Sequence, residues 1–243
     1  MSEKRHLIII GGQRSGTTLL HRYLSSHPNI LMSQPVQPEP KYFLHNVGSN
    51  IEDYRSSLFA DAQADHLLLG EKSTSYYEHP QIIPLIKEMM PDVKLIFLIR
   101  NPLERALSNY FFSLENGLET RSLEEVFLEN VPPPKTGLKI SVDPFNYIGR
   151  GDYEFLLRPF ANEFGSQLHV FPFEDLNFDD GCKRIIDFLE LEYHPVLTDQ
   201  KELVNASVRF NVSDEIRLRI ASQYAPKRDS LEAFLKMDLS DWN

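Results

Sequence analysis

A glycine-rich turn stands directly between an apolar run and a helical pattern near the start of the chain. Residues 7–10, Leu-Ile-Ile-Ile, are followed by Gly-Gly-Gln-Arg-Ser-Gly-Thr-Thr at 11–18, and an amphipathic stretch then continues to Ser26. A buried strand, a tight turn and a helix in this order aim backbone N–H groups and a helix N-terminus at one point, which favours an anion. The sequence therefore predicts a phosphate-binding loop.

The loop departs from the nucleoside-triphosphate pattern G-x-x-x-x-G-K-[ST] at one position. The lysine position is Thr17, and the cation of the loop is Arg14, three residues earlier. Arginine carries a planar fork of donors that matches phosphate oxygens. We therefore expect a phosphate-like anion here without the lysine of an ordinary ATP or GTP site. The expected anion contacts are Arg14, Ser15, Gly16, Thr17 and Thr18.

The composition limits the classes of protein to consider. With 243 residues, 42% of them hydrophobic and 25% charged, the chain is long enough for one domain with a sizeable core, expected over residues 1–243. The net charge of −10 argues against a nucleic-acid partner, which requires a basic surface. The lone Cys182 excludes an intrachain disulfide and fits a reducing compartment. The polar start and the short first apolar run predict a cytoplasmic protein with no membrane span.

Short apolar runs alternate with helical patterns along the chain. The expected strands are 7–10, 29–32, 67–70, 93–99 and 168–173, and the expected helices are 17–26, 81–90, 102–115, 152–164, 181–191, 213–224 and 227–235. This alternation predicts an α/β fold: a P-loop-like three-layer domain whose mainly parallel central sheet is flanked by helices, with ligands at the carboxyl ends of the strands. Two Pro-containing regions, 34–48 and 130–146, look irregular, and we expect the second to form part of a lid.

Two clusters of polar residues follow the second and third expected strands. In Glu39-Pro-Lys-Tyr-Phe, a carboxylate precedes aromatic residues, an arrangement that suits a partly desolvated general base. In Gly70-Glu-Lys-Ser-Thr-Ser-Tyr-Tyr, Lys72 stands at a strand end, where it could reach an anionic leaving group. The alternatives are a solvated loop carboxylate for Glu39, and a surface lysine or a pair with Glu71 for Lys72.

A further cluster, Arg100-Asn-Pro-Leu-Glu-Arg-Ala-Leu-Ser, follows the fourth expected strand. Arg100 ends that strand and Ser108 lies two helical turns further on, so a phosphate beside the helix start could contact both. A kinase or NTPase would instead carry a metal-binding Asp at such a strand end. Arginine binds phosphate and cannot bind magnesium, so no metal site is expected.

These motifs together resemble those of sulfotransferases that use 3′-phosphoadenosine 5′-phosphosulfate (PAPS). Q-R-S-G-T-T resembles the 5′-phosphosulfate loop of that family, and R-N-P-L-E-R-A-L-S resembles its 3′-phosphate motif. E-P-K-Y-F and E-K-S-T-S-Y-Y resemble motifs of the heparan-sulfate branch and its bacterial relatives. The arginine in the first loop is closer to the tyrosylprotein and bacterial types than to the lysine-bearing cytosolic ones.

The resemblance implies a role for each motif. The loop from Arg14 to Thr18 would bind the 5′-phosphosulfate, with Arg14 stabilising charge on the departing phosphate oxygen. Arg100 and Ser108 would bind the 3′-phosphate. Glu39 would take the proton from an acceptor hydroxyl, and Lys72 would stabilise the transferring sulfuryl group or orient the acceptor. The acceptor hydroxyl would belong to a carbohydrate, a lipid or small-molecule alcohol, a tethered acyl chain or a tyrosyl peptide, with carbohydrate-like acceptors slightly favoured. The transfer would need no metal.

Several alternatives stay open at this point. Cytosolic relatives use histidine as the base, so His45 or His79 could replace Glu39. A loop near the C-terminus covers the 3′-phosphate in relatives, and Lys201, Asn205, Ser207 and Arg209 lie in the corresponding stretch. The other function classes are a small-molecule or nucleotide kinase, which would bind ATP with magnesium, and a non-catalytic nucleotide-binding protein, which would tolerate the loss of Glu39.

Overall fold

The computed structural model describes residues 4–46, 48–135, 142–177, 179–195 and 209–242. Its contacts divide the chain into two compact units. The sheet unit comprises Met1–Ile99 and Arg158–Gln200, and the helical unit comprises Arg100–Leu157 and Lys201–Asn243. The expectation of a single domain over residues 1–243 stays a prediction.

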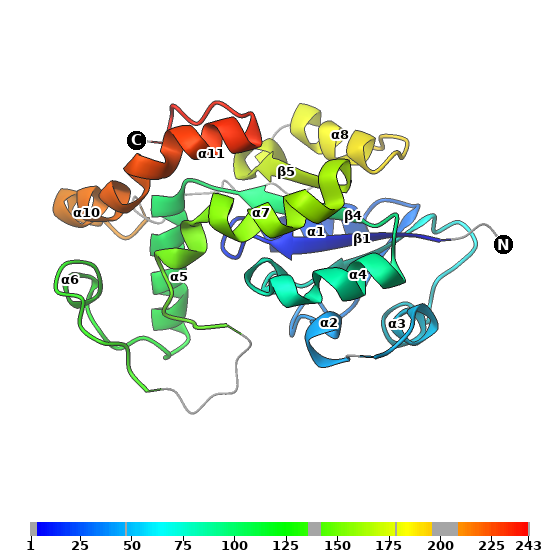
Figure 1. Ribbon diagram of the computed structural model, residues 1–243, viewed down its shortest axis with the longest axis horizontal. Coiled ribbons are helices and arrows are strands. Elements are labelled where there is room, and N and C mark those ends of the chain that lie inside the picture. Colours follow the sequence, from blue (N-terminus) through cyan, green and yellow to red (C-terminus); the bar gives the residue numbers. More distant parts are fainter. Residues whose placement is uncertain (1–3, 47, 136–141, 178, 196–208, 243) are drawn as a thin grey trace. The chain divides into compact units, whose positions relative to one another are not determined.

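The sheet unit is built on five parallel strands in the order β2-β3-β1-β4-β5, and Figure 1 labels β1, β4 and β5. The strands are β1 Arg5–Gly11, β2 Ile30–Met32, β3 Leu68–Lys72, β4 Lys94–Ile99 and β5 Leu168–Pro172. All five predicted strands are confirmed, because a parallel strand covered on both faces reads as a short, continuous apolar run. Since β1 is central, the glycine-rich turn that follows it lies at the middle of the sheet edge where all five carboxyl ends meet.

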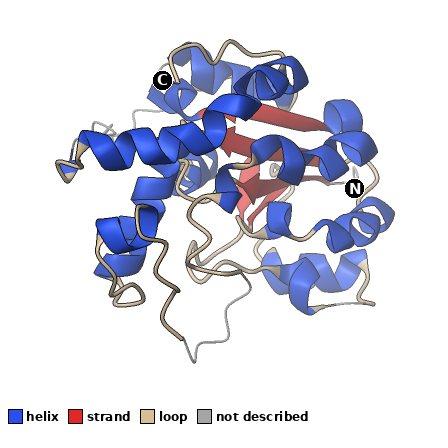
Figure 2. Cartoon of the chain, turned by 60° about the vertical axis from the view of Figure 1, so that its left-hand side comes forward, coloured by secondary structure: helices blue, strands red, loops and turns tan. Residues whose placement is uncertain are grey.

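Helices of the sheet unit flank the sheet, and Figure 2 shows the strands among them. They are α1 Thr17–Ser25, α2 Tyr42–His45, α3 Ile51–Leu58, α4 Ile83–Met89 and α8 Asp179–Phe188, and α7 Tyr153–Phe164 crosses from the helical unit into this one. Short 3-10 helices add Tyr76–Glu78, Pro80–Ile82, Gly165–Gln167 and Phe173–Asn177. The predicted α/β fold with a parallel central sheet and flanking helices is confirmed.

The main core of the sheet unit lies between one face of the sheet and two helices. Leu7 and Ile9 of β1 are fully buried with Leu20 and Leu24 of α1 and Ile185 of α8. Side chains alternate across a strand, so Ile8 and Ile10, which are also fully buried, face the other side. Two buried faces hold β1 rigidly, and the turn after it starts from a fixed point.

The helical unit contains α5 Pro102–Glu115, α6 Leu123–Phe127, α10 Asp214–Tyr224 and α11 Arg228–Leu235, with 3-10 helices at Gly149–Gly151 and Ala225–Lys227. Its core joins Leu107 and Phe111 of α5 to Ile216 and Ile220 of α10. The predicted start of α5 is confirmed, because the Asn101 side chain accepts a hydrogen bond from the Leu103 amide at 2.9 Å and caps the helix.

Three short helices, α2, α3 and α6, were not among the predicted elements. Two of them carry capping boxes that the sequence does display, Asn50 with Asp53 for α3 and Ser122 with Glu125 for α6. The region 34–48, predicted as irregular, contains α2. Part of the predicted lid, residues 136–141, lies outside the described residues, so the lid stays a prediction.

Candidate active site

The turn after β1 contains two residues in the left-handed backbone region, which glycine adopts easily and arginine does not. Gly16 lies in the left-handed region with φ of 82°, and an added Cβ would come within 2.7 Å of the Phe173 ring. Arg14 is also left-handed, with φ of 67°. A non-glycine residue there costs energy that the surrounding structure must offset, a feature concentrated at binding sites.

Two backbone hydrogen bonds fix the turn. The Ser15 amide donates to the Gly12 carbonyl at 3.2 Å, and the Gly12 amide donates to the Leu98 carbonyl of β4 at 3.0 Å. The Ser15 side chain is fully buried, and its hydroxyl has no hydrogen-bond partner among the described residues. Nor does any described side chain cap the N-terminus of α1. A buried donor and an uncapped helix start at one place fit an anion that would accept from both.

Glu39 and Lys72, predicted separately from two motifs, are in direct contact. The Lys72 ammonium donates to Glu39 Oε1 at 2.6 Å, and the two side chains are 3% and 13% exposed. Thr74 holds the same carboxylate twice, through its amide to Oε2 at 2.9 Å and its hydroxyl to Oε1 at 2.8 Å. The alternative pairing of Lys72 with Glu71 is not what the structure contains, since these two neighbours point to opposite sides of β3.

A carboxylate offers about four lone-pair sites to donors. Three donors, the Lys72 ammonium, the Thr74 amide and the Thr74 hydroxyl, contact Glu39 among the described residues. One acceptor position is therefore left for a further donor. Because the side chain keeps some exposure, a substrate hydroxyl could reach it.

The pair lies beside the turn because of how β3 ends. The Ser73 amide donates to the Ile9 carbonyl of β1 at 3.1 Å, which continues the β1–β3 ladder past Lys72. Four residues after Ser73, the Tyr77 ring reaches the turn itself, within 2.8 Å of where a Cβ on Gly11 would lie. The predicted anion loop and the Glu39–Lys72 pair thus lie at neighbouring strand ends.

The alternative bases named from the sequence, His45 and His79, stay predictions. His45 is exposed, and His79 contacts Gln81 at 3.0 Å. His21, which the sequence did not single out, is buried beneath the site. Burial lowers its pKa, and its two ring nitrogens contact the Ser33 carbonyl at 3.0 Å and the Ser25 hydroxyl at 3.3 Å. These two contacts hold the ring of His21 in place.

Arg100 and Ser108, the predicted 3′-phosphate residues, belong to the helical unit. Arg100 is buried, and its carbonyl accepts from the Tyr153 hydroxyl at 2.8 Å. Ser108 is partly exposed on α5. Of the predicted C-terminal loop residues, Lys201, Asn205 and Ser207 lie outside the described residues, and Arg209 pairs with Glu115 at 3.4 Å.

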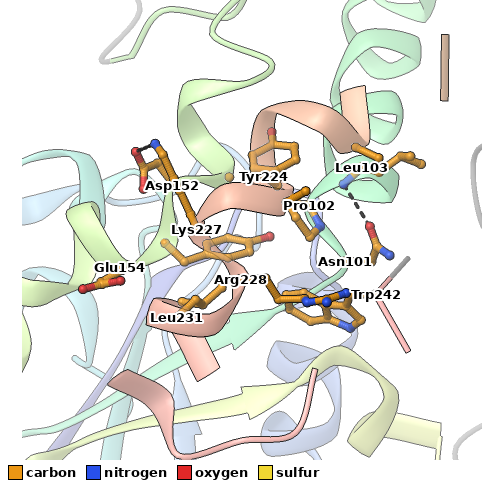
Figure 3. A pocket seen from close by; sticks show the side chains of 14 residues that line it. Asn101, Pro102, Leu103, Asp152, Glu154, Tyr224, Lys227, Arg228, Leu231 and Trp242 are labelled. Atoms are coloured by element: carbon orange, nitrogen blue, oxygen red, sulfur yellow. Dashed lines mark hydrogen bonds and ion pairs between the residues drawn. The ribbon is translucent and has the colours of Figure 1, made fainter. Parts of the chain in front are cut away.

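The helical unit also contains an apolar cavity of about 170 Å³ (Figure 3). Pro102, Tyr224, Leu231 and Trp242 are among the residues that line it. The polar groups at its edge already have partners within the unit: Lys227 pairs with Asp152, and Glu154 accepts from the Ser230 hydroxyl at 2.6 Å. The lining of the cavity is therefore mainly apolar.

Comparison with known proteins decides the family. The sulfotransferase domain family matches residues 4–211. The chain belongs to the sulfotransferase family. The chain is 34% identical over 111 residues, 45% of its own length and 23% of the other's, to the membrane-associated sulfotransferase kil1 of Dictyostelium discoideum. It is 28% identical over 207 residues, 84% of its length, to heparan sulfate glucosamine 3-O-sulfotransferase 3A1 of Mus musculus, of which it covers 49%.

A solved sulfotransferase from Alicyclobacillus acidocaldarius has the same fold, with a TM-score of 0.74, 23% identity and 99% of each chain covered. The chain spans half or less of the length of the curated relatives named above. Among the described residues, no helix is both long and apolar enough to cross a membrane. A cytoplasmic location and independence of metal stay predictions.

The sequence missed two residues that complete the site. Thr74 supplies two donors to Glu39, and Glu71 contacts the backbone just after it. The alternation of a strand offered a signal for Thr74, because residues two apart share one side and Lys72 was already a candidate. Glu71 was considered only as an ion-pair partner of Lys72.

Proposed function

We propose that this chain transfers a sulfuryl group from PAPS to a hydroxyl group of an acceptor, with Glu39 as the general base. The observation that carries the proposal is the Glu39 carboxylate, held by Lys72 at 2.6 Å and by Thr74 at a strand end beside the anion-binding turn. Family membership supports the reaction class, since the match covers residues 4–211.

The residues of the turn fit the phosphosulfate end of PAPS. The buried Ser15 hydroxyl, the N-terminal amides of α1 and the fork of Arg14 would contact its anionic oxygens, together with Gly16, Thr17 and Thr18. Arg100 and Ser108 are proposed to bind the 3′-phosphate, which distinguishes PAPS from AMP. PAPS supplies the sulfuryl group, bonded through oxygen to a phosphate that can leave.

Each side chain then has one task. Glu39 accepts the proton of the acceptor hydroxyl at its remaining lone pair, so that the oxygen can bond to sulfur. Lys72, 2.6 Å from Glu39, places a positive charge beside the point of transfer. Arg14 and the α1 N-terminus stabilise the negative charge that collects on the departing phosphate oxygen. Fixed charges and positioning provide the catalysis, as in phosphoryl transfer.

Among acceptors, we propose a carbohydrate hydroxyl first. The named relative from Mus musculus is a heparan sulfate glucosamine 3-O-sulfotransferase, and its match extends over 84% of this chain. A screen with ³⁵S-labelled PAPS would compare unsulfated heparosan, N-sulfated heparosan, a simple aryl alcohol and a tyrosyl peptide. Label in a polysaccharide supports the proposal, and label only in the aryl alcohol or the peptide would replace it with another acceptor class.

The donor is tested by calorimetric titration with 3′-phosphoadenosine 5′-phosphate (PAP), AMP and ATP without added metal. We expect PAP to bind at least tenfold more tightly than AMP, and Arg100→Ala to remove most of that difference. Equal affinity for PAP and AMP would contradict PAPS as the donor. ATP binding that appears only with magnesium would instead favour a kinase.

A further inference from the structure

Glu71 is a buried carboxyl group that the proposed reaction does not use. Glu71 is fully buried at the end of β3, and no cation among the described residues contacts it. Three hydroxyls donate to it: Ser73 at 2.5 Å and Tyr76 at 2.6 Å to Oε1, and Tyr54 at 3.1 Å to Oε2. Burial raises the pKa of Glu71, and these hydrogen bonds act in the opposite direction. Hydrogen bonds alone therefore stabilise this group.

Two of these hydroxyls relay hydrogen bonds from the backbone that follows Glu39. The Lys41 amide donates to Ser73 Oγ at 2.8 Å, and the Phe43 amide donates to the Tyr76 hydroxyl at 3.0 Å. Each of these hydroxyls in turn donates a hydrogen bond to Glu71 Oε1. The amide between them, that of Tyr42, reaches the same oxygen directly at 3.4 Å. Three successive backbone amides thus converge on one carboxylate oxygen.

This convergence fixes a segment that would not hold its shape alone. Lys41 is left-handed, with φ of 49°, which is uncommon for a residue with a side chain. The amides of residues 41–43 begin the short helix α2, and the first amides of a helix have no partner within it. Glu71 satisfies them, directly or through one hydroxyl. Glu39 lies only two residues before this anchored point.

The end of β3 therefore acts on the Glu39 segment from both of its sides. Lys72 and Thr74 hold the Glu39 carboxylate, while Glu71 and Ser73, on the alternate side, hold the backbone after it. We propose that Glu71 is a positioning residue, which keeps Glu39 on Lys72 and Thr74 by anchoring residues 41–43 through Ser73 and Tyr76. This inference rests on the proposed function in which Glu39 is the base.

Hydroxyl deletions separate positioning from general stability. Ser73→Ala and Tyr76→Phe each break one relay to residues 41–43. Tyr54→Phe is the matched control, because Tyr54 donates to the other oxygen of Glu71 and to no amide of that segment. We expect both relay variants to lower kcat by about 10- to 100-fold, as displaced catalytic groups do. PAP affinity should stay within twofold of the wild type, and Tyr54→Phe should keep kcat within twofold.

Glu71→Ala removes the acceptor of the Tyr42 amide and of both relay hydroxyls, and we expect it to lower kcat the most. Where that variant does not fold, the relay variants and their control still decide. If kcat falls as far in Tyr54→Phe as in Tyr76→Phe, and if kcat decreases in parallel with thermal stability in every variant, then Glu71 is only structural and the inference is wrong.

Amide hydrogen exchange tests the positioning without any turnover. Exchange at residues 41–43 should quicken at least tenfold in the relay variants and not in Tyr54→Phe. The Thr74 amide, which donates to Glu39 at 2.9 Å, should quicken with them. An unchanged Thr74 amide would overturn the inference, because Glu39 would then hold its place without the anchor. A wild type that binds no PAP and transfers no label would overturn the proposed function alone.

Discussion

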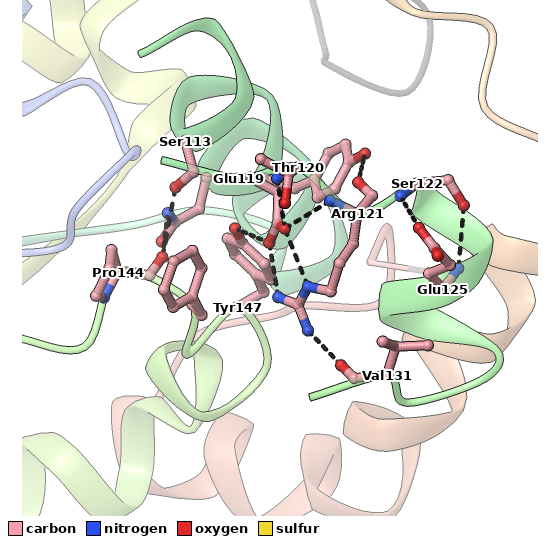
Figure 4. A network of polar contacts seen from close by, with 12 residues as sticks. Ser113, Glu119, Thr120, Arg121, Ser122, Glu125, Val131, Pro144 and Tyr147 are labelled. Carbon is pink, nitrogen blue, oxygen red and sulfur yellow. Dashed lines mark hydrogen bonds and ion pairs between the residues drawn. The ribbon is translucent and has the colours of Figure 1, made fainter. Parts of the chain in front are cut away.

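Two carboxylates, one in each unit, have a cation 2.6 Å away and are held very differently. Glu39 in the sheet unit contacts Lys72 and Thr74 and keeps 13% of its side chain exposed. Glu119 in the helical unit is fully enclosed (Figure 4). It accepts from Arg121 through Nε and Nη2, from the amides of Thr120 and Arg121, and from the Tyr147 hydroxyl at 2.8 Å.

The number of hydrogen-bond donors distinguishes Glu39, the candidate site, from Glu119, which we call a clamp because it only holds the fold together. Glu119 receives five donors, so each lone pair is used, and its Arg121 partner also reaches the Val131 carbonyl and ties three parts of the helical unit together. Glu39 receives three and keeps one acceptor position with access. A carboxylate with all its lone pairs taken can stabilise a fold, whereas one with a position left can also accept a proton from a substrate.

The largest effect we expect is on turnover, from Glu39→Gln. The amide keeps the size of the side chain but cannot accept a proton, and a general base contributes about 10²- to 10⁴-fold to rate. We therefore expect kcat to fall by that factor and PAP affinity, measured by calorimetry, to stay within twofold. The matched control is Glu119→Gln, whose turnover per folded molecule should equal that of the wild type. A Glu39→Gln enzyme with more than a third of normal turnover would remove Glu39 from the role of base.

The next effect is on stability, from that same Glu119→Gln change. It leaves the buried Arg121 guanidinium without its charged partner and places an NH₂ group among five donors, and breaking a buried pair in this way costs about 3–5 kcal/mol. Urea denaturation should show a decrease of that order in the free energy of unfolding. Glu39→Gln should cost less, because its NH₂ group meets three donors instead of five and the side chain keeps some exposure to water. If the two variants lose equal stability, the distinction between site and clamp fails.

How much of this contrast the sequence predicted depends on the distance between partners along the chain. The five strands were predicted because burial on both faces leaves a local apolar signal. Glu39 and Lys72 were each found from their own motif, but their contact spans 33 positions and no local pattern encodes it. The role of Glu71 was missed for the same reason, since its relays join β3 to residues 41–43.

The short helices were missed for the opposite reason: the sequence does contain a local signal for them, but the prediction did not use it. The capping boxes of α3 and α6 are legible in the sequence, but both helices are only five to eight residues long, and such segments depend on tertiary contacts. Glu119 gave no motif at all. Its donors come from its neighbours and from Tyr147, which lies 28 positions away.

A smaller effect is the response of the two units to acid. In the sheet unit, burial and then the charge of Arg55 lower the pKa of His6 to about 4. In the helical unit, burial alone would raise the pKa of Glu119, but hydrogen bonds from Arg121, Tyr147 and Thr120 outweigh it and lower the pKa to about 2. Both shifts mean that the unfolded chain binds more protons, so both contributions to stability are lost as pH falls.

The pH windows differ between the units. The His6 contribution is complete above about pH 6.5 and declines towards pH 4, whereas the Glu119 contribution is complete above about pH 4.5 and declines towards pH 2. Each is worth at most about 3 kcal/mol. Denaturation should be measured at pH 7, 5 and 3. His6→Gln should reduce the loss of unfolding free energy between pH 7 and 5, and Glu119→Gln should reduce the loss of unfolding free energy below pH 4.5. Unaltered slopes in either variant would assign that acid sensitivity to other groups.

The smallest effect should come from an ion pair that is neither a site nor a clamp. Lys183 and Asp187 lie one turn apart on α8, 2.5 Å from each other, with about half of each side chain exposed. Water and salt screen such a pair, so it contributes about 0.3–0.5 kcal/mol at most. Lys183→Ala should therefore change the free energy of unfolding by less than about 0.5 kcal/mol, and turnover not at all. The nitrogen–oxygen distance within this pair is as short as those within Glu39–Lys72 and Glu119–Arg121. A loss of several kcal/mol in Lys183→Ala would therefore mean that proximity alone, and not enclosure and donor number, sets the strength of a charge pair in this fold.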